Sequence, residues 1–189
     1  MTDKPLSEIL QETPVICAVK SFKELEASLH CDSHIIFILF GDVLSVSDIV
    51  AKIKAADKLA FIHMDLIEGL SPKEVSVDFL AQNTEADGII STKIGIVKRA
   101  KKLNLFTIYR CFVLDSLSLK NIKKQIPFEN ADALEILPGA MPKTIKTIVG
   151  LTDKPVIASG LILDKEDVMC AIKAGATSVS STNPGVWRV

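Results

Sequence analysis

Short runs of aliphatic and β-branched residues alternate with amphipathic segments along the chain from Pro14 onward. The runs have the length of strands, and the segments between them repeat apolar residues at helical spacing. Because no long loop interrupts this rhythm, the pattern predicts parallel strands joined by crossover helices. The predicted strands cover residues 15–19, 34–40, 59–63, 88–90, 105–112, 133–137, 156–158 and 178–180.

The segments between these strands carry helix start and stop signals. Ser21 followed by Glu24 has the spacing of a capping box, Pro142 suits a first helical position, and Gly175 suits a left-handed residue after a helix end. The predicted helices cover residues 22–29, 48–57, 71–80, 93–103, 115–126 (or 116–126), 142–149 and 164–175.

The number and order of these elements favour one fold. Eight strands without a Gly-x-Gly-x-x-Gly fingerprint after the first favour a TIM-type (β/α)8 barrel, with an open doubly wound sheet as the alternative. We therefore expect an α/β fold in which residues 1–189 form a single-domain compact barrel and residues 1–13 form an N-terminal lead-in. Too few residues follow the eighth strand for a full helix, so we expect the last helix to be truncated or missing. Trp187 is then expected to cover the barrel bottom or a partner.

Composition limits the cellular setting and the chemistry. Hydrophobic residues make up 48% of the chain with one Trp and one Tyr, which predicts a mainly aliphatic core. The first residues are polar, and no apolar run approaches the roughly 20 residues that span a bilayer. The cysteines form no Cys-x-x-Cys pair, which argues against a zinc ribbon or a disulfide framework. We expect a reduced, cytoplasmic protein without a membrane partner; its cysteines are Cys17, Cys31, Cys111 and Cys170.

The stretch from Pro155 to Thr182 has the order of elements that holds a phosphate in the last two units of such a barrel. A buried strand ends in Ser159 and Gly160, a helix follows, and a second strand ends in Ser180, Ser181 and Thr182. Glycine lets the backbone approach an anion closely, and the following N–H groups and hydroxyls donate to its oxygens. The sequence therefore predicts an anion site here.

Polar residues end the other strands, and in a barrel these ends meet at one mouth. Two interpretations of Arg110 stay open with equal weight: an ion pair with Glu135 on the next strand, or a ligand contact. His63, Asp65 and Glu135 lack a close-spaced second histidine, so a metal site is not expected and no cofactor is expected. The residues at the predicted mouth are Lys20, Gly41, Asp42, His63, Asp65, Ser91, Thr92, Lys93, Arg110, Glu135, Pro138 and Gly139.

With these residues in place, the chain resembles the glycerol-3-phosphate-responsive antiterminators, the glycerol uptake operon antiterminator regulatory proteins. The resemblance covers nearly the whole chain, and its segments are specific when taken together and in order. They are PVICAVK at 14–20, HMDLIEG at 63–69, ADGIISTK at 86–93, ALEILPG at 133–139, PVIASGLI at 155–162 and SST at 180–182.

The resemblance implies a TIM-barrel sensor that is not an enzyme, binds sn-glycerol 3-phosphate as effector, and acts on leader mRNA to prevent premature termination of transcription in glycerol-metabolism operons. It places the phosphate at Ser159, Gly160, Ser181 and Thr182. It places the glycerol part near Lys20, Asp65, Lys93 and Glu135. Whether the protein forms a homo-oligomer stays open.

Charge is unevenly distributed along the chain. The net charge is −1, but between Lys93 and Ile126 nine lysines and arginines face one acid, Asp115. A basic surface of this kind suits RNA phosphates, although a solvated lysine-rich face is the plain alternative. Few aromatic residues accompany it, so recognition of RNA shape and backbone is expected rather than base readout. The fourth and fifth helices are expected to be neighbours on the barrel exterior. The predicted RNA-binding residues on them are Lys98, Arg99, Lys101, Lys102, Lys120, Lys123 and Lys124.

Two other functions compete with a ligand-gated RNA-binding regulator. One is a small TIM-barrel isomerase, synthase or aldolase acting on a phosphorylated three-carbon or sugar substrate, with Asp65 and Glu135 as acid and base. Only analogy of fold supports it. The other is a ligand-binding protein that docks a protein partner through Trp187 and the shortened C-terminus.

Overall fold

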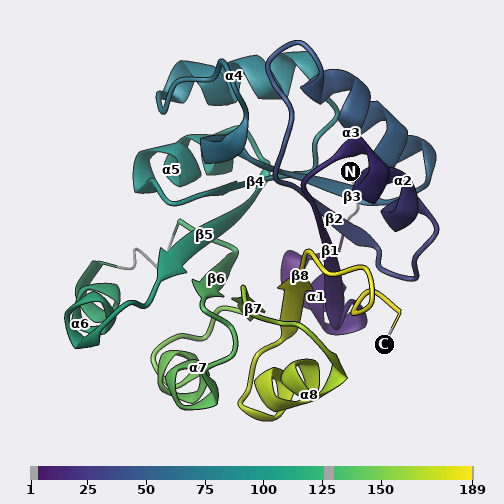
Figure 1. Ribbon diagram of the computed structural model, residues 1–189. Coiled ribbons are helices and arrows are strands. Elements are labelled where there is room, and N and C mark those ends of the chain that lie inside the picture. The colour runs from purple at the N-terminus through teal and green to yellow at the C-terminus, as the bar shows by residue number, and fades with distance from the viewer. Residues whose placement is uncertain (1–3, 126–129, 189) are drawn as a thin grey trace.

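Eight parallel strands close on themselves in chain order, with β8 pairing back to β1. The computed structural model describes residues 4–125 and 130–188, without the side chains of residues 121 and 123–125. Figure 1 shows the helices arranged around the strands. The strands are β1 (Val15–Val19), β2 (Ile35–Ile38), β3 (Leu59–His63), β4 (Gly88–Ser91), β5 (Phe106–Phe112), β6 (Ala133–Leu137), β7 (Val156–Ser159) and β8 (Ser178–Ser181).

The predicted strands and crossover helices are all present, and the closed sheet excludes the doubly wound alternative. The predicted bounds coincide with the observed ones for β1, β3 and β6 and for the helices at residues 22–29 and 142–149. The helices are α1 (Leu6–Glu12), α2 (Phe22–Leu29), α3 (Val46–Ala55), α4 (Glu74–Asn83), α5 (Ile94–Lys102), α6 (Ser116–Gln125), α7 (Pro142–Val149) and α8 (Lys165–Lys173), with a short 3-10 helix η1 (Met64–Leu66).

Local side chains explain where several helices begin. The Ser21 hydroxyl accepts from Glu24 N at 3.3 Å, as a helix cap should. The return bond of the expected capping box is shifted by one residue, because Glu24 Oε2 accepts from Lys20 N at 2.5 Å instead of from Ser21 N. Asp164 Oδ1 caps α8 by accepting from Asp167 N at 3.0 Å. Before α3, Asp42 Oδ1 accepts from two successive backbone N–H groups, and the helix starts two residues earlier than predicted.

Alternation along each strand separates two apolar layers, as period-two side chains require. Ile16, Phe37, Phe61 and Ile108 belong to the cluster inside the barrel. Their strand neighbours point outward and pack with the helices in a larger cluster. The core is mainly aliphatic, as expected from the composition.

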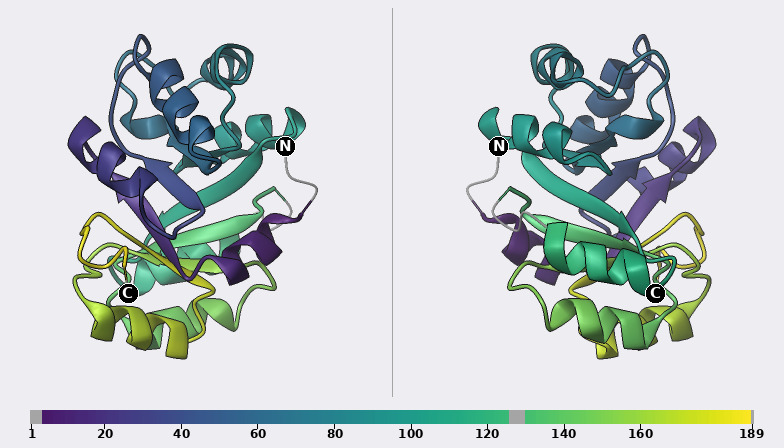
Figure 2. Two further views of the ribbon diagram at one scale, coloured as in Figure 1. Left: turned by 90° about the vertical axis from the view of Figure 1, so that its right-hand side faces the viewer. Right: turned by 90° about the vertical axis from the view of Figure 1, so that its left-hand side faces the viewer.

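Helix α1 closes the barrel end opposite to the mouth, and the pattern analysis did not predict it within the lead-in. Its apolar residues Leu6, Ile9 and Leu10 belong to the interior cluster. Ser178 Oγ, at the start of β8, donates to Leu10 O at 2.9 Å and ties the helix to the strands. Figure 2 shows this helix, in dark purple, lying against the barrel.

The chain after β8 forms turns, and residues 182–188 contain no helix. Trp187 is 3% exposed, packs in the outer layer, and donates from Nε1 to Ser181 O at 2.7 Å. The end of the barrel interior is therefore filled by α1 and not by Trp187, whose indole lies in the outer layer in place of part of the missing helix. A role of Trp187 in docking a partner stays a prediction.

Within the described residues, no helix combines the length and apolar character needed to cross a bilayer.

Candidate functional site

A cavity of about 160 Å³ lies where β7 and β8 end at the barrel mouth. Its walls come from the loop that follows β7, the end of β8, and inward residues of β1, β5 and β6. Among the described residues that line it, Arg110 is the only one with a formal charge. The lining residues are Ala18, Leu39, Arg110, Leu137, Ser159, Gly160, Leu161, Ile162, Leu163, Ser180, Ser181, Thr182 and Asn183.

The backbone of the loop after β7 has a conformation that lets a ligand approach it closely. Gly160 has φ of +74° and Leu161 has φ of +58°, a conformation that a leucine rarely adopts and that marks local constraint. Within the described part of the chain, the backbone N–H groups of Leu161 and Ile162 have no hydrogen-bond acceptor. Two unpaired donors beside a cavity are an anion-binding arrangement.

The turn after β6 supports this loop from behind. Gly139 N donates to Gly160 O at 2.9 Å. A Cβ added at Gly139 would lie 2.7 Å from Ser159 N, so only glycine allows this approach. The turn thereby fixes the backbone of the predicted anion site.

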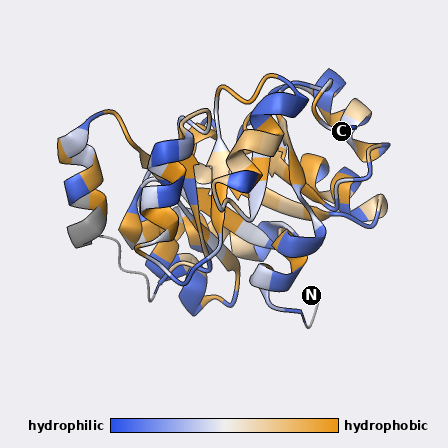
Figure 3. Cartoon of the chain, turned by 90° about the horizontal axis from the view of Figure 1, so that it is seen from below, coloured by the Kyte–Doolittle hydropathy of each residue, from blue (hydrophilic) through white to orange (hydrophobic). Residues whose placement is uncertain are grey.

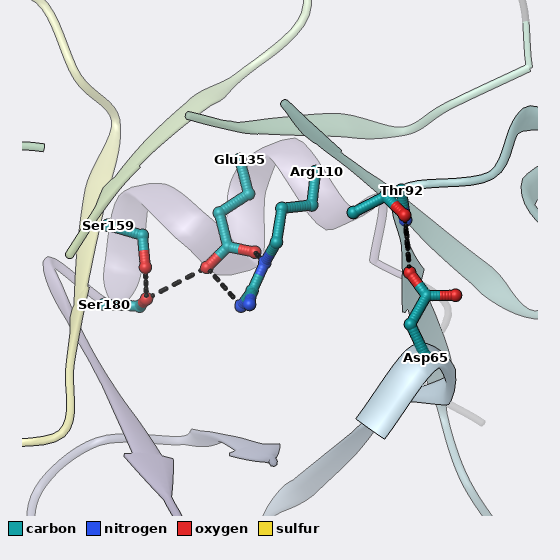
Figure 4. A network of polar contacts seen from close by, with 6 residues as sticks. All are labelled: Asp65, Thr92, Arg110, Glu135, Ser159 and Ser180. Atoms are coloured by element: carbon teal, nitrogen blue, oxygen red, sulfur yellow. Dashed lines mark hydrogen bonds and ion pairs between the residues drawn. The ribbon is translucent and has the colours of Figure 1, made fainter. Parts of the chain in front are cut away.

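A continuous chain of polar contacts runs beneath the cavity (Figure 4). The Ser159 and Ser180 hydroxyls lie 2.6 Å apart, and Ser180 Oγ donates to Glu135 Oε1 at 3.1 Å. Arg110 then contacts Glu135 twice, from Nε to Oε2 at 2.6 Å and from Nη2 to Oε1 at 3.0 Å. The side chain of Glu135 is fully buried and that of Arg110 is 8% exposed. Of the two interpretations of Arg110, the ion pair with Glu135 is present, and the guanidinium also lines the cavity.

A second polar cluster lies across the mouth around Asp65. Its carboxylate accepts from Ser91 Oγ at 2.8 Å, from Thr92 N at 2.7 Å and from Thr92 Oγ1 at 2.8 Å. Burial alone would raise the pKa of Asp65, but the hydrogen bonds from Thr92 and Ser91 outweigh it and hold the pKa below its usual value. Lys93 Nζ lies 3.8 Å from Asp65 Oδ1. Asp65 is therefore an ionised acceptor that orders the turn after β4.

His63 ends β3 inside the mouth and is 2% exposed. Its Nδ1 is buried without a hydrogen-bond partner among the described residues. Burial, and after it the positive charge of Arg110, lower the pKa of His63 to about 4. The imidazole is therefore neutral at pH 7.

The structure places the predicted ligand residues in four settings. Ser159, Gly160, Ser181 and Thr182 all line the cavity. The Ser181 hydroxyl, however, already donates to Ile162 O at 2.8 Å. The side chains of Lys20, Asp65, Lys93 and Glu135 are not among the described residues that line it: the lysines are exposed, Asp65 lies in the second cluster, and Glu135 lies beneath Arg110.

The sequence placed Ser180 and His63 at strand ends of the mouth, but neither was among the residues predicted to contact the ligand. Alternation along β8 could have identified Ser180, because residues 178, 180 and 182 share the inward face. The ion pair of Arg110 with Glu135 was one of the two interpretations from the sequence, and the two residues are paired in register on neighbouring strands.

The predicted basic surface presents less unpaired positive charge in the structure than its sequence indicates. Lys98, Lys102 and Lys120 are exposed. Arg99 Nη2 lies 2.6 Å from Asp78 Oδ1, and Lys101 pairs with Asp132. Figure 1 shows α6 standing away from α5, rather than beside it as expected. The predicted residues Lys123 and Lys124 have side chains outside the described part of the chain.

The described residues contain no group of three His, Cys, Asp or Glu side chains that could hold a metal ion.

Comparisons with known proteins show the family of the chain. Residues 15–187 match the family described as "Glycerol-3-phosphate responsive antiterminator". The chain is 47% identical over 185 residues to the protein YgcP of Escherichia coli (strain K12), covering 98% of this chain and 97% of that protein. The structure of a glycerol uptake operon antiterminator regulatory protein from Listeria monocytogenes is similar with a TM-score of 0.87 and 31% identity, covering 92% of this chain and 94% of that one.

A glycerol uptake operon antiterminator-related protein from Thermotoga maritima is similar with a TM-score of 0.82 and 28% identity, covering 93% of this chain and 98% of that one.

Proposed function

We propose a function from one premise: this chain belongs to the glycerol-3-phosphate responsive antiterminator family. It acts as a cytoplasmic sensor that binds sn-glycerol 3-phosphate and, when loaded, binds leader mRNA of glycerol-metabolism operons and prevents termination. The observation that carries this proposal is the cavity at the ends of β7 and β8, with unpaired N–H donors on its wall.

The phosphate of the ligand is proposed to sit against Ser159, Gly160, Ser181 and Thr182. The Gly160 loop offers N–H groups, and Thr182 lies on the same wall. Because the Ser181 hydroxyl is engaged with Ile162 O, Ser181 contributes through its backbone in this proposal.

The glycerol part is proposed to face the centre of the mouth, toward Lys20, Asp65, Lys93 and Glu135. Asp65 carries an ionised carboxylate, which accepts hydrogen bonds from ligand hydroxyls in the same way as it does from Thr92. Glu135 acts through Arg110 in this arrangement, because both of its oxygens already have partners.

We favour a sensor over an enzyme on the state of the carboxylates. A general acid that works near pH 7 needs a pKa raised toward neutrality. Asp65 has a lowered pKa instead, and Glu135 is fully buried in a bidentate ion pair. The structure of deoxyribose phosphate aldolase from Aeropyrum pernix is also similar, with a TM-score of 0.67, but at 15% identity this similarity concerns the fold alone.

RNA binding is proposed on the exposed lysines of α5 and α6. Lys98, Lys102 and Lys120 extend into solvent, where they neutralise backbone phosphates. Such contacts position an RNA without reading its bases, so recognition relies on RNA shape.

The test is leader-RNA affinity measured with and without sn-glycerol 3-phosphate at two salt concentrations. We expect the ligand to tighten RNA binding and salt to weaken it. Glycerol and a phosphate ester of a longer sugar serve as ligand controls. RNA affinity that ignores the ligand, or turnover of the ligand during the titration, contradicts the proposal.

A further inference from the structure

The predicted phosphate site lacks a cation of its own. Its residues are hydroxyl-bearing side chains and glycine, while Lys20 and Lys93 are exposed and do not line the cavity. Lys93 Nζ faces Asp65 at 3.8 Å. A phosphate monoester carries close to two negative charges at pH 7, and burying them without a counter-charge is costly.

Arg110 is in position to provide that charge. It ends the interior stretch of β5, lines the cavity, and is buried enough that water screens it little. A guanidinium has five N–H donors, and Glu135 occupies two of them. No other described residue accepts from the remaining three.

Glu135 holds the guanidinium in one plane and thereby fixes the direction of its remaining N–H groups. The carboxylate is fully buried and does not line the cavity, whereas Arg110 does. Figure 4 shows the two side chains facing one another. Ser180 donates to the same carboxylate and contacts Ser159, so these two hydroxyls at the cavity and the guanidinium belong to one hydrogen-bond network. A bidentate pair fixes the direction of the other donors better than a lysine would.

We propose that Arg110 is the anion-anchoring residue of this cavity, held by Glu135, and that it selects ligands that carry a phosphate group. This inference rests on the proposed function for the identity of the ligand, but its core is the cation. The lysines at the mouth then act on the organic part of the ligand and do not set the affinity for phosphate.

The decisive variant removes both charges, Arg110→Gln with Glu135→Gln, so that no unpaired carboxylate stays buried. Calorimetry with inorganic phosphate and with sn-glycerol 3-phosphate should show affinities that fall roughly 10- to 100-fold, the worth of a hydrogen bond to a charged group. Circular dichroism and thermal unfolding verify the fold. Lys52→Gln with Glu26→Gln removes an exposed ion pair with the same change of charge, is the matched control, and should bind both ligands as the parent chain does.

Two single variants separate the roles. Arg110→Lys keeps the charge but loses the planar fork, so phosphate affinity should fall roughly 10-fold. Glu135→Gln keeps an acceptor for Arg110 and removes a negative charge near the anion, so phosphate affinity should persist. Phosphate affinity that falls in Glu135→Gln but persists unchanged in Arg110→Lys would overturn the proposed arrangement, because the anion would then depend on the carboxylate and not on the guanidinium.

The outcomes also separate this inference from the proposed function. If the parent chain binds inorganic phosphate but not sn-glycerol 3-phosphate, the proposed effector is wrong. The phosphate affinity of the Arg110 variants then still decides whether Arg110 binds the anion. A folded double variant that binds phosphate as tightly as the parent chain overturns the inference and leaves the proposed function standing. A parent chain that binds neither ligand overturns both.

Discussion

Single residues at the mouth show how burial changes chemistry. His63 and Glu135 are both enclosed, but Glu135 keeps a guanidinium partner while His63 has none for Nδ1. Burial of an ionisable group without a partner favours its neutral form. The barrel mouth therefore combines one buried ion pair with one neutral imidazole.

Acid stability should depend on His63. Its pKa is about 4 in the folded chain and about 6.5 in the unfolded chain. Below pH 6.5 the unfolded chain gains a proton that the folded chain refuses, so the free energy of unfolding falls as pH drops and stops falling near pH 4. Replacing His63→Gln should flatten this slope and recover roughly 2 to 3 kcal/mol of the loss between pH 7 and pH 4. Urea unfolding of both chains at several pH values measures it, and equal slopes would count against a buried neutral His63.

Among the elements, α1 determines how the barrel interior is closed. The strands alone leave the interior cluster open at the end away from the mouth, and Leu6, Ile9 and Leu10 complete it. A helix this short is marginal in isolation, so packing rather than propensity holds it. Its stabilising contribution should therefore appear in the unfolding of the whole barrel.

The α1 contact can be measured with one pair of variants. Leu10 is fully buried, so Leu10→Ala should lower the free energy of unfolding by about 2 to 5 kcal/mol. Leu44→Ala is the matched control, because Leu44 is 88% exposed in the loop before α3. Equal and small effects in both variants would mean that α1 does not seal the barrel.

Over the whole molecule, charge is distributed by tertiary structure rather than by sequence order. The basic run from α5 to α6 contains one acid, but Asp78 from α4 and Asp132 from the segment before β6 pair with two of its cations. Exposed ion pairs contribute little stability, but they reduce the net charge presented to RNA. Figure 3 shows hydrophilic and hydrophobic residues alternating along the helices. The free lysines are the ones to test.

Charge reversal tests the basic surface. Lys98→Glu with Lys102→Glu should weaken leader-RNA binding and reduce its dependence on salt by about one to two released counterions, while ligand affinity stays unchanged. Lys146→Glu with Lys173→Glu makes the same change of net charge on α7 and α8 and is the matched control. RNA affinity that falls equally in both pairs would indicate a general effect of net charge instead of a surface on α5.

The sequence alone determined the strands, the crossover helices and the barrel, because alternating and helical periodicities are local and eight of them in order leave few topologies. It also placed Ser159, Gly160 and Thr182 at one site, because parallel strands end on the same face. Tertiary structure decided the rest. The use of α1 as a plug, the burial of Trp187, the neutral His63 and the pairing of Lys101 with Asp132 all depend on contacts between distant segments, and no local pattern records which side chain will meet which.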